Sequence, residues 1–233
     1  AGGEVKLRGD LPRITATQGT LTLSGGLMTL DLAGELGYAP VTCRGRITRD
    51  GQGSPALDLR VEGRNVLLAQ DRDLRLRADV DLGLGGPLAA LVLSGTARIT
   101  DALWSQRIDL LRASTPDADQ RLQFFAIRQG PFAGMRLDLG IRADRTLRLA
   151  NNIITADCSL DLRLGGTGAV PVPEGRLWTT DARLSLPFSS LRLDRAEVRF
   201  ASDSPFRPSL EASGRTRMQG YELSAIATGP IDD

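Results

Sequence analysis

The chain has 233 residues and a formal net charge of +1, with 29 basic and 28 acidic residues. Because this charge is near zero, no strong field would attract nucleic acid or an anionic surface, and we expect no nucleic-acid partner. Aromatic residues make up only 4% of the sequence, whereas hydrophobic residues make up 41%. A compact β-sandwich usually needs large rings in its middle, so this composition favours a long, thin apolar layer.

Alternation of apolar and polar residues is clearest from Leu74 to Leu84. Every second residue there is apolar, and arginine, aspartate or glycine fills most positions between. This period of two predicts a β-strand with one buried and one solvated face. It excludes a helix, whose period would scatter the apolar residues around its surface.

The same pattern recurs along the chain in short segments separated by Gly, Pro or Asp turns, which predicts about fifteen to eighteen strands. The segments are residues 5–7, 21–23, 28–32, 41–47, 57–61, 74–84, 91–93, 97–99, 108–110, 122–127, 135–143, 147–149, 160–164, 170–172, 184–188, 191–193, 198–200, 210–212 and 221–227. Pro171 and Pro173 cannot donate to a sheet, so their segment is expected at an edge, a bulge or a loop. Residues 118–127 could instead hold a helical turn, and the polar residues 114–119 best fit a boundary between two halves.

Two parts of the chain resemble each other at an offset of eighty residues. Residues 81–86 (DLGLGG) match residues 161–166 (DLRLGG), and Gly95, Thr100 and Asp101-Ala102 have counterparts at the same offset. We interpret this as an internal duplication of residues 64–113 and 150–200, although any two strand-turn-strand segments share some likeness. The whole chain, residues 1–233, is expected to be a single elongated β domain and a fragment of a longer protein.

The usual sources of catalysis are missing from this sequence. It contains no histidine, which is the commonest general base and metal ligand, and it has no nucleophile elbow, phosphate loop or dinucleotide fingerprint. Asp79 and Asp81 could form a glycosidase-type pair, but they alternate with apolar residues as the solvated face of a strand would. We therefore expect no enzyme, no metal site and no cofactor. A surface carboxylate enzyme is the least favoured hypothesis.

The two cysteines, Cys43 and Cys158, both occupy apolar positions of alternating runs. No Cys-x-x-Cys spacing indicates a metal site. A free thiol behaves as a small apolar side chain and fits these positions, while a single long-range disulfide is the alternative.

Several motifs occur in the order found in a known family. They are residues 64–68 (RNVLL), 81–86 (DLGLGG), 93–99 (LSGTARI), 193–200 (LDRAEVRF), 204–212 (SPFRPSLEA), 220–223 (GYEL) and 229–230 (GP). This order resembles the C-terminal region of the TamB (translocation and assembly module) family in the AsmA-like superfamily. The resemblance runs from about Arg64 to Pro230, and the first sixty residues fit only as generic strands.

The resemblance implies an all-β fold, a long sheet curled lengthwise into a β-taco with an apolar concave groove. A β-solenoid or a sandwich is the alternative architecture. The resemblance also implies a periplasmic location, an inner-membrane anchor outside this chain, and a role in moving phospholipid between the two bacterial membranes. The alternative role is a scaffold that assists assembly of outer-membrane β-barrel proteins through its strand edges, with an assembly protein as partner.

If the apolar face is open, it would contact phospholipid acyl chains. Burial of each methylene contributes about 0.8 kcal/mol of binding free energy. The residues expected to line such a groove come from the longest alternating runs and their copies. They are Leu76, Val80, Leu82, Leu137, Leu139, Ile141, Leu160, Leu162 and Leu164.

Overall fold

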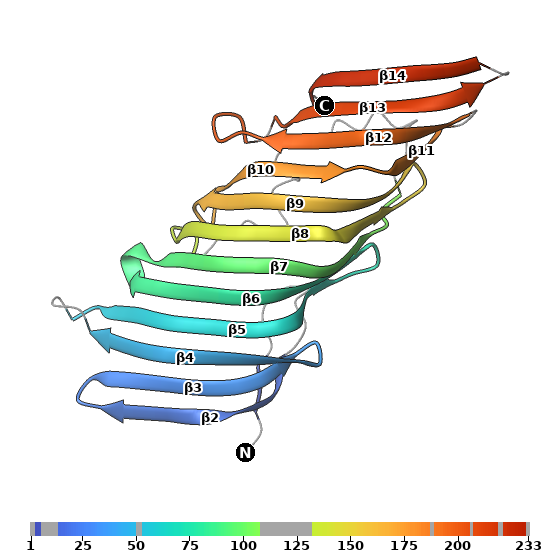
Figure 1. Cartoon of the computed structure of the whole chain (residues 1–233). Helices are drawn as coiled ribbons and strands as arrows, with labels where there is room; N and C mark the ends of the chain where they lie inside the picture. Colours follow the sequence, from blue (N-terminus) through green and yellow to red (C-terminus); the bar gives the residue numbers. More distant parts are fainter. Residues whose placement is uncertain are drawn as a thin grey trace.

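The computed structural model describes residues 3–5, 14–49, 53–107, 132–186, 189–205, 207–218 and 221–231. These residues form one sheet, in which nearly every strand lies beside its sequence neighbours (Figure 1). The strands are β1 (Gly3–Val5), β2 (Ile14–Ser24), β3 (Leu27–Leu36), β4 (Ala39–Arg49), β5 (Pro55–Gln70), β6 (Leu74–Pro87), β7 (Val92–Trp104), β8 (Arg136–Ala150), β9 (Ile154–Gly166), β10 (Pro171–Thr179), β11 (Ala182–Leu186), β12 (Ser189–Phe200), β13 (Ser209–Met218) and β14 (Tyr221–Pro230). One 3₁₀ turn, η1 (Leu88–Ala90), follows β6.

The sheet is an antiparallel meander with one parallel junction. β7 and β8 pair in parallel, whereas the other neighbours pair antiparallel. β10 and β11 both lie between β9 and β12, and they run in the same direction, so together they fill one position in the sheet. The parallel junction separates the meander into β1–β7 and β8–β14. The polar boundary expected at residues 114–119, the segments at 108–110 and 122–127, and the alternative helical turn lie outside the described residues.

The all-β prediction and the curled sheet are confirmed, and the sandwich and solenoid alternatives are wrong for the described residues, which form one sheet. The accessible surface of the chain is 15794 Å² for a mass of 25.0 kDa. A compact monomer of this mass exposes about 10,000 Å². The larger surface is expected for a single layer, which has two accessible faces.

The described strands are longer than the sequence pattern predicts. Eleven of the fourteen described strands contain ten or more residues, against about 5–6 in a typical sheet. Residues 92–93 of the expected segment 91–93 and all of the segment 97–99 belong to β7, and Gly95 lies between them. A Cβ atom at Gly95 would overlap the carbonyl oxygen of Asp81 on β6, so this glycine permits close pairing rather than a turn.

A line of β-bulges crosses the sheet, and we call it the crease. It comprises residues 64–65 of β5, 100–101 of β7, 144–146 of β8, the break at 180–181 between β10 and β11, and residue 194 of β12. A bulge adds a residue, bends the strand and increases its twist. In β7 the positions on the apolar face are odd-numbered up to Ile99 and even-numbered from Ala102, because the bulge shifts the alternation by one. Apolar side chains therefore stay on one face across the crease.

Side chains form hydrogen bonds with backbone groups and with one another at the crease. Asn65 adopts a positive φ of 51°, donates its backbone N–H to the Asp79 carboxylate at 2.8 Å and accepts a 3.0 Å bond from the Thr100 hydroxyl. The hydroxyl of Thr146 donates to the carbonyl of Ile99 at 2.7 Å. These bonds replace the ladder bonds that the bulges remove, so the bends are fixed parts of the sheet.

Small side chains flank the crease on the apolar face. Ala78, Ala102, Ala143, Ala156 and Ala182 are each 5% exposed or less. They alternate with larger residues across the strands, for example where Ile99 lies between Ala78 and Ala143. These small side chains are buried because the larger side chains of the neighbouring strands cover them.

Candidate functional site

All nine predicted lining residues lie on the same face of the sheet. Residues paired across strands share a face, and the pairing connects Leu82, Gly95, Leu139 and Leu164 in one row. A second row contains Val80, Ala97, Ile141 and Leu162. The other three predicted residues lie in rows parallel to these. Leu76 is paired with Ala102, Leu137 with Leu93, and Leu160 with Ala143.

This apolar face is only partly covered. Val80 and Leu160 are 9% and 8% exposed, whereas the other seven predicted residues are half-buried. Exposure increases toward the N-terminal edge of the face, where Leu21 and Leu23 of β2 are 57% and 77% exposed. The face therefore presents a row of apolar atoms that solvent still reaches.

The apolar face extends beyond the residues that the sequence analysis named. β7 contributes Leu93, Ala97 and Ile99 between the predicted residues of β6 and β8. Further members on other strands are Leu57, Leu59, Val61, Leu177, Leu193 and Val198. These segments also show the period-two pattern, but glycine or a bulge interrupts their runs. The prediction of lining residues rests on the longest runs and therefore misses them.

The opposite face carries charge, mostly in cross-strand ion pairs. Examples are Arg60 with Asp81 at 2.7 Å, Arg75 with Asp101 at 2.7 Å, and Arg163 with Asp138 at 2.9 Å. Both partners of these pairs are well exposed, and such pairs each contribute at most about 1 kcal/mol. The arginine-rich composition therefore serves a solvated face, as the alternation predicts.

One carboxylate on the charged face is buried. Glu197 of β12 is 2% exposed and accepts from Arg195 at 2.9 Å and from Arg199 at 2.7 Å. These two hydrogen bonds lower the pKa of Glu197. Its cross-strand neighbour Trp178 holds the guanidinium of Arg176 at 4.5 Å from the ring centroid. Trp178 and Glu197 are paired across β10 and β12, beside the crease.

Both cysteines are free, so the alternative of a disulfide between them is not realised. Cys43 is half-buried on the apolar face, in the row that contains Val61 and Leu82. Cys158 is buried, and this burial raises the pKa of its thiol to about 11. Within the described residues, no group of three or more Cys, Asp or Glu side chains could hold a metal ion.

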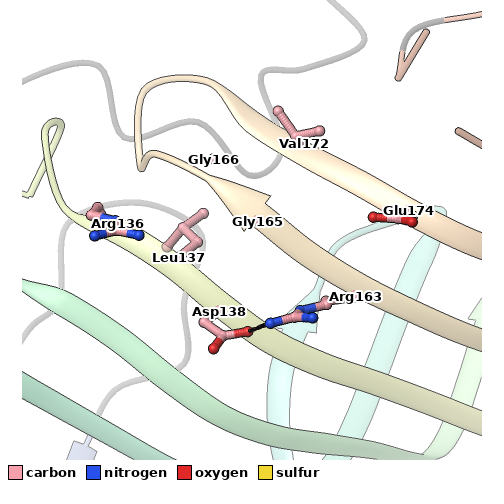
Figure 2. Close-up of a pocket in the computed structure, with 8 residues that line it drawn as sticks. All are labelled: Arg136, Leu137, Asp138, Arg163, Gly165, Gly166, Val172 and Glu174. Carbon is pink, nitrogen blue, oxygen red and sulfur yellow. Dashed lines mark hydrogen bonds and ion pairs between the residues drawn. The ribbon is translucent and has the colours of Figure 1, made fainter. Parts of the chain in front are cut away.

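The prolines of β10 lie where the sequence analysis expected a sheet edge. Residues 171–174 pair with β9 alone, and pairing with β12 begins at Gly175. Near this edge, a hollow of about 370 Å³ opens beside the hairpin that joins β9 to β10. Figure 2 shows its lining residues, which are Arg136, Leu137, Asp138, Arg163, Gly165, Gly166, Val172 and Glu174.

The sequence profile of the TamB C-terminal domain matches residues 12–233. The chain belongs to the TamB family. The match confirms the resemblance and extends it, because residues before Arg64 are covered as well. A search of curated proteins and a search of solved structures each returned no match.

TamB proteins are membrane-associated bacterial proteins, and the TamB domain is not known as an enzyme family. None of the helices within the described ranges is long and apolar enough to cross a membrane.

Proposed function

We propose that this TamB domain carries phospholipid between the inner and outer membranes of a bacterium, with the acyl chains lying along the apolar face. The domain would reside in the periplasm, held to the inner membrane by a segment outside this chain, and it would act without catalysis. The observation that supports the proposal is the continuous apolar face, whose predicted residues are mostly half-buried rather than sealed.

The energetics of such a face fit transport. Each methylene that leaves water contributes about 0.8 kcal/mol, so two acyl chains would be held firmly. Rows of similar aliphatic side chains repeat from β6 to β9. An acyl chain that moves by one row would therefore exchange one set of contacts for a comparable set. A uniform surface of this kind retains a lipid without fixing it at one position.

The experiment is native mass spectrometry of the purified domain, with lipid extraction from the same sample. Leu139→Asp and Leu162→Arg each place a charge on the apolar face and should abolish bound phospholipid. Ser209→Asp is the matched control, because Ser209 is exposed on the charged face opposite Arg199. A wild-type domain that carries no lipid and takes up none from vesicles would contradict the proposal.

A second function is favoured by the sheet edge at β14. Among the described residues β14 pairs only with β13, and Tyr221, Leu223 and Ile226 are 74%, 47% and 80% exposed. An open edge offers unpaired N–H and C=O groups to an extended strand. We therefore retain, as the alternative, a scaffold that assists folding of outer-membrane β-barrel polypeptides, with an assembly protein of that membrane as partner.

Proline substitutions test the alternative. At two adjacent positions of a strand, one N–H points to the neighbouring strand and the other points outward. Of Ala227→Pro and Thr228→Pro, the variant that keeps wild-type stability marks the outward position. It should lose co-purification of an unfolded β-barrel polypeptide if the edge binds clients. Client binding that persists in this variant but disappears in Leu139→Asp would assign binding to the apolar face instead.

A further inference from the structure

Three neighbouring turns at one end of the strands form a connected surface, which we call the ledge. They are residues 88–91 between β6 and β7, residues 132–135 before β8, and residues 167–170 between β9 and β10. Backbone N–H groups join them: that of Gly168 donates to the carbonyl of Met135 at 2.8 Å, and that of Arg136 donates to the carbonyl of Leu91 at 2.9 Å. In Figure 1 the ledge lies at the left, where β7, β8 and β10 begin.

Each turn of the ledge exposes one large apolar side chain. Leu88, Phe132 and Val170 are 37%, 41% and 53% exposed. By contrast, Leu91 and Met135 are buried and hold their turns against the sheet. The ledge is therefore an ordered surface from which three apolar side chains reach the solvent.

The ledge contains no charged residue. The turns at the opposite end of the strands are polar, for example Asp71-Arg72-Asp73 between β5 and β6 and Asn151-Asn152 between β8 and β9. Exposed turns are usually polar because water surrounds them, and a group of exposed apolar side chains without charge is typical of a contact surface. The two ends of the strands therefore differ in the kind of partner that they fit.

The ledge is also continuous with the apolar face. Leu91 and Met135 lie two residues before Leu93 and Leu137, and the period of two places them on the same side of the sheet. Leu93 and Leu137 are paired, in the row that continues to Leu84. An apolar phase in contact with the ledge would thus adjoin the apolar face directly.

We propose that the ledge is a membrane contact, which inserts Leu88, Phe132 and Val170 into the surface of a lipid bilayer. A bilayer suits the ledge because such binding grows with the apolar area that leaves water and needs no charge on the protein. A second copy of the chain suits it less, since three partly exposed side chains offer far less than the roughly 800 Å² that each partner of a stable dimer buries. The inference goes beyond the proposed function, because a domain can bind a bilayer without removing lipid from it.

The experiment is flotation of the purified domain with neutral phosphatidylcholine vesicles in a density gradient, at low and at high salt. Val170→Asp and Leu88→Asp should each lower the partition into vesicles about tenfold, because each replaces an inserted apolar side chain with a charge. Val170→Trp should raise the partition about threefold. Salt should not change the wild-type partition, since the ledge is uncharged, and circular dichroism checks that each variant is folded.

Tyr38→Asp is the matched control. Tyr38 is 94% exposed in the turn between β3 and β4, at the opposite end of the strands, so this variant should keep the wild-type partition. An equal loss in Tyr38→Asp, or no loss in the two ledge variants, would overturn the inference. A loss in Leu23→Asp alone would assign the contact to the edge strand β2 instead.

Two further measurements separate this inference from its neighbours. Light scattering without vesicles tests the second copy, and a dimer that Val170→Asp dissociates would assign the ledge to that interface and overturn the membrane contact. Native mass spectrometry tests lipid carriage by itself. A wild-type domain that retains lipid but does not float would contradict the membrane contact alone, whereas one that floats but retains no lipid would contradict only the proposed function.

Discussion

Gly95 and Gly175 occupy equivalent places in two hairpins. Gly95 pairs with Leu82 on β6, and Gly175 pairs with Leu162 on β9. Both have a φ of 131°, and a Cβ atom at either would overlap a carbonyl oxygen of the partner strand, that of Asp81 or Asp161. Gly19 and Gly45 overlap the partner strand in the same way, at the carbonyl oxygens of Asp31 and Asp58, and both lie outside the two similar segments. The shared geometry is therefore a property of the pairing in this sheet, and the duplication stays a prediction.

Because Gly95 and Gly175 have the same geometry, alanine at either position should lower the free energy of unfolding by a similar amount. Gly95→Ala and Gly175→Ala should each lower the free energy of unfolding by about 1–3 kcal/mol, because each combines an unfavourable φ with backbone overlap. Urea denaturation measures the change. Gly85→Ala is the control and should change stability by less than about 1 kcal/mol, since its Cβ has room. Wild-type stability in both alanine variants would show that the strands separate without cost.

The crease at Asn65 predicts a difference between two substitutions. Asn65→Val and Asn65→Gly both lose the hydrogen bond from Thr100, but only valine must also adopt the left-handed conformation with a branched side chain. The valine variant should be less stable than the glycine variant by about 1–2 kcal/mol in thermal or urea unfolding. Equal stabilities would mean that the bulge relaxes to an ordinary strand.

Glu197 predicts a pH dependence of stability. The pKa of Glu197 is lowered in the folded state by Arg195 and Arg199, so its contribution is present above the ordinary glutamate pKa and is lost as pH falls through the lower, folded value. Glu197→Gln should lower the free energy of unfolding at pH 7 by about 1–2 kcal/mol. This is less than for a fully buried pair, because the two arginines are 59% and 60% exposed.

The same variant should also lose less stability than the wild type between pH 5 and the acid limit of folding. Parallel acid titrations of the two proteins, followed by circular dichroism, measure this difference. Identical pH profiles would show that Glu197 is not ionised differently in the folded and unfolded chains.

The two thiols should differ in reactivity. Cys158 has a pKa of about 11, so only about 0.1% of it is thiolate at pH 8, and its burial also blocks access. Cys43 should therefore react first with maleimide, and Cys158 should react only at strongly alkaline pH or after unfolding. Intact mass and peptide mapping distinguish the two. Bound lipid should slow labelling of Cys43, which lies on the apolar face, and Cys43→Ser provides the control.

Alternation was enough to predict which side chains share a face, because cross-strand pairing preserves the face from one strand to the next. It placed Leu74–Leu84 in one strand, and β6 spans Leu74–Pro87. It failed on strand length wherever a bulge moved the apolar positions from odd to even numbers, as between Leu193 and Ala196 in β12. In a single sequence, such a shift resembles the end of one strand and the start of another.

The hollow could not be predicted from the sequence for a different reason. Its lining residues come from β8, β9 and β10, and it lies where residues 171–174 of β10 pair with β9 alone. The charges of Arg136 and Glu174 belong to strands two positions apart in the sheet, and only the pairing order brings them to one hollow.

The meander of β-strands has a consequence for how such a domain could change in size. Most strands contact only the strands before and after them, so adding or deleting a hairpin would alter the dimension across the strands by about 10 Å and leave the distant contacts as they are. Stability would then accumulate strand by strand, as it does in repeat proteins. Duplication of a hairpin unit would thus be a direct route to a longer span.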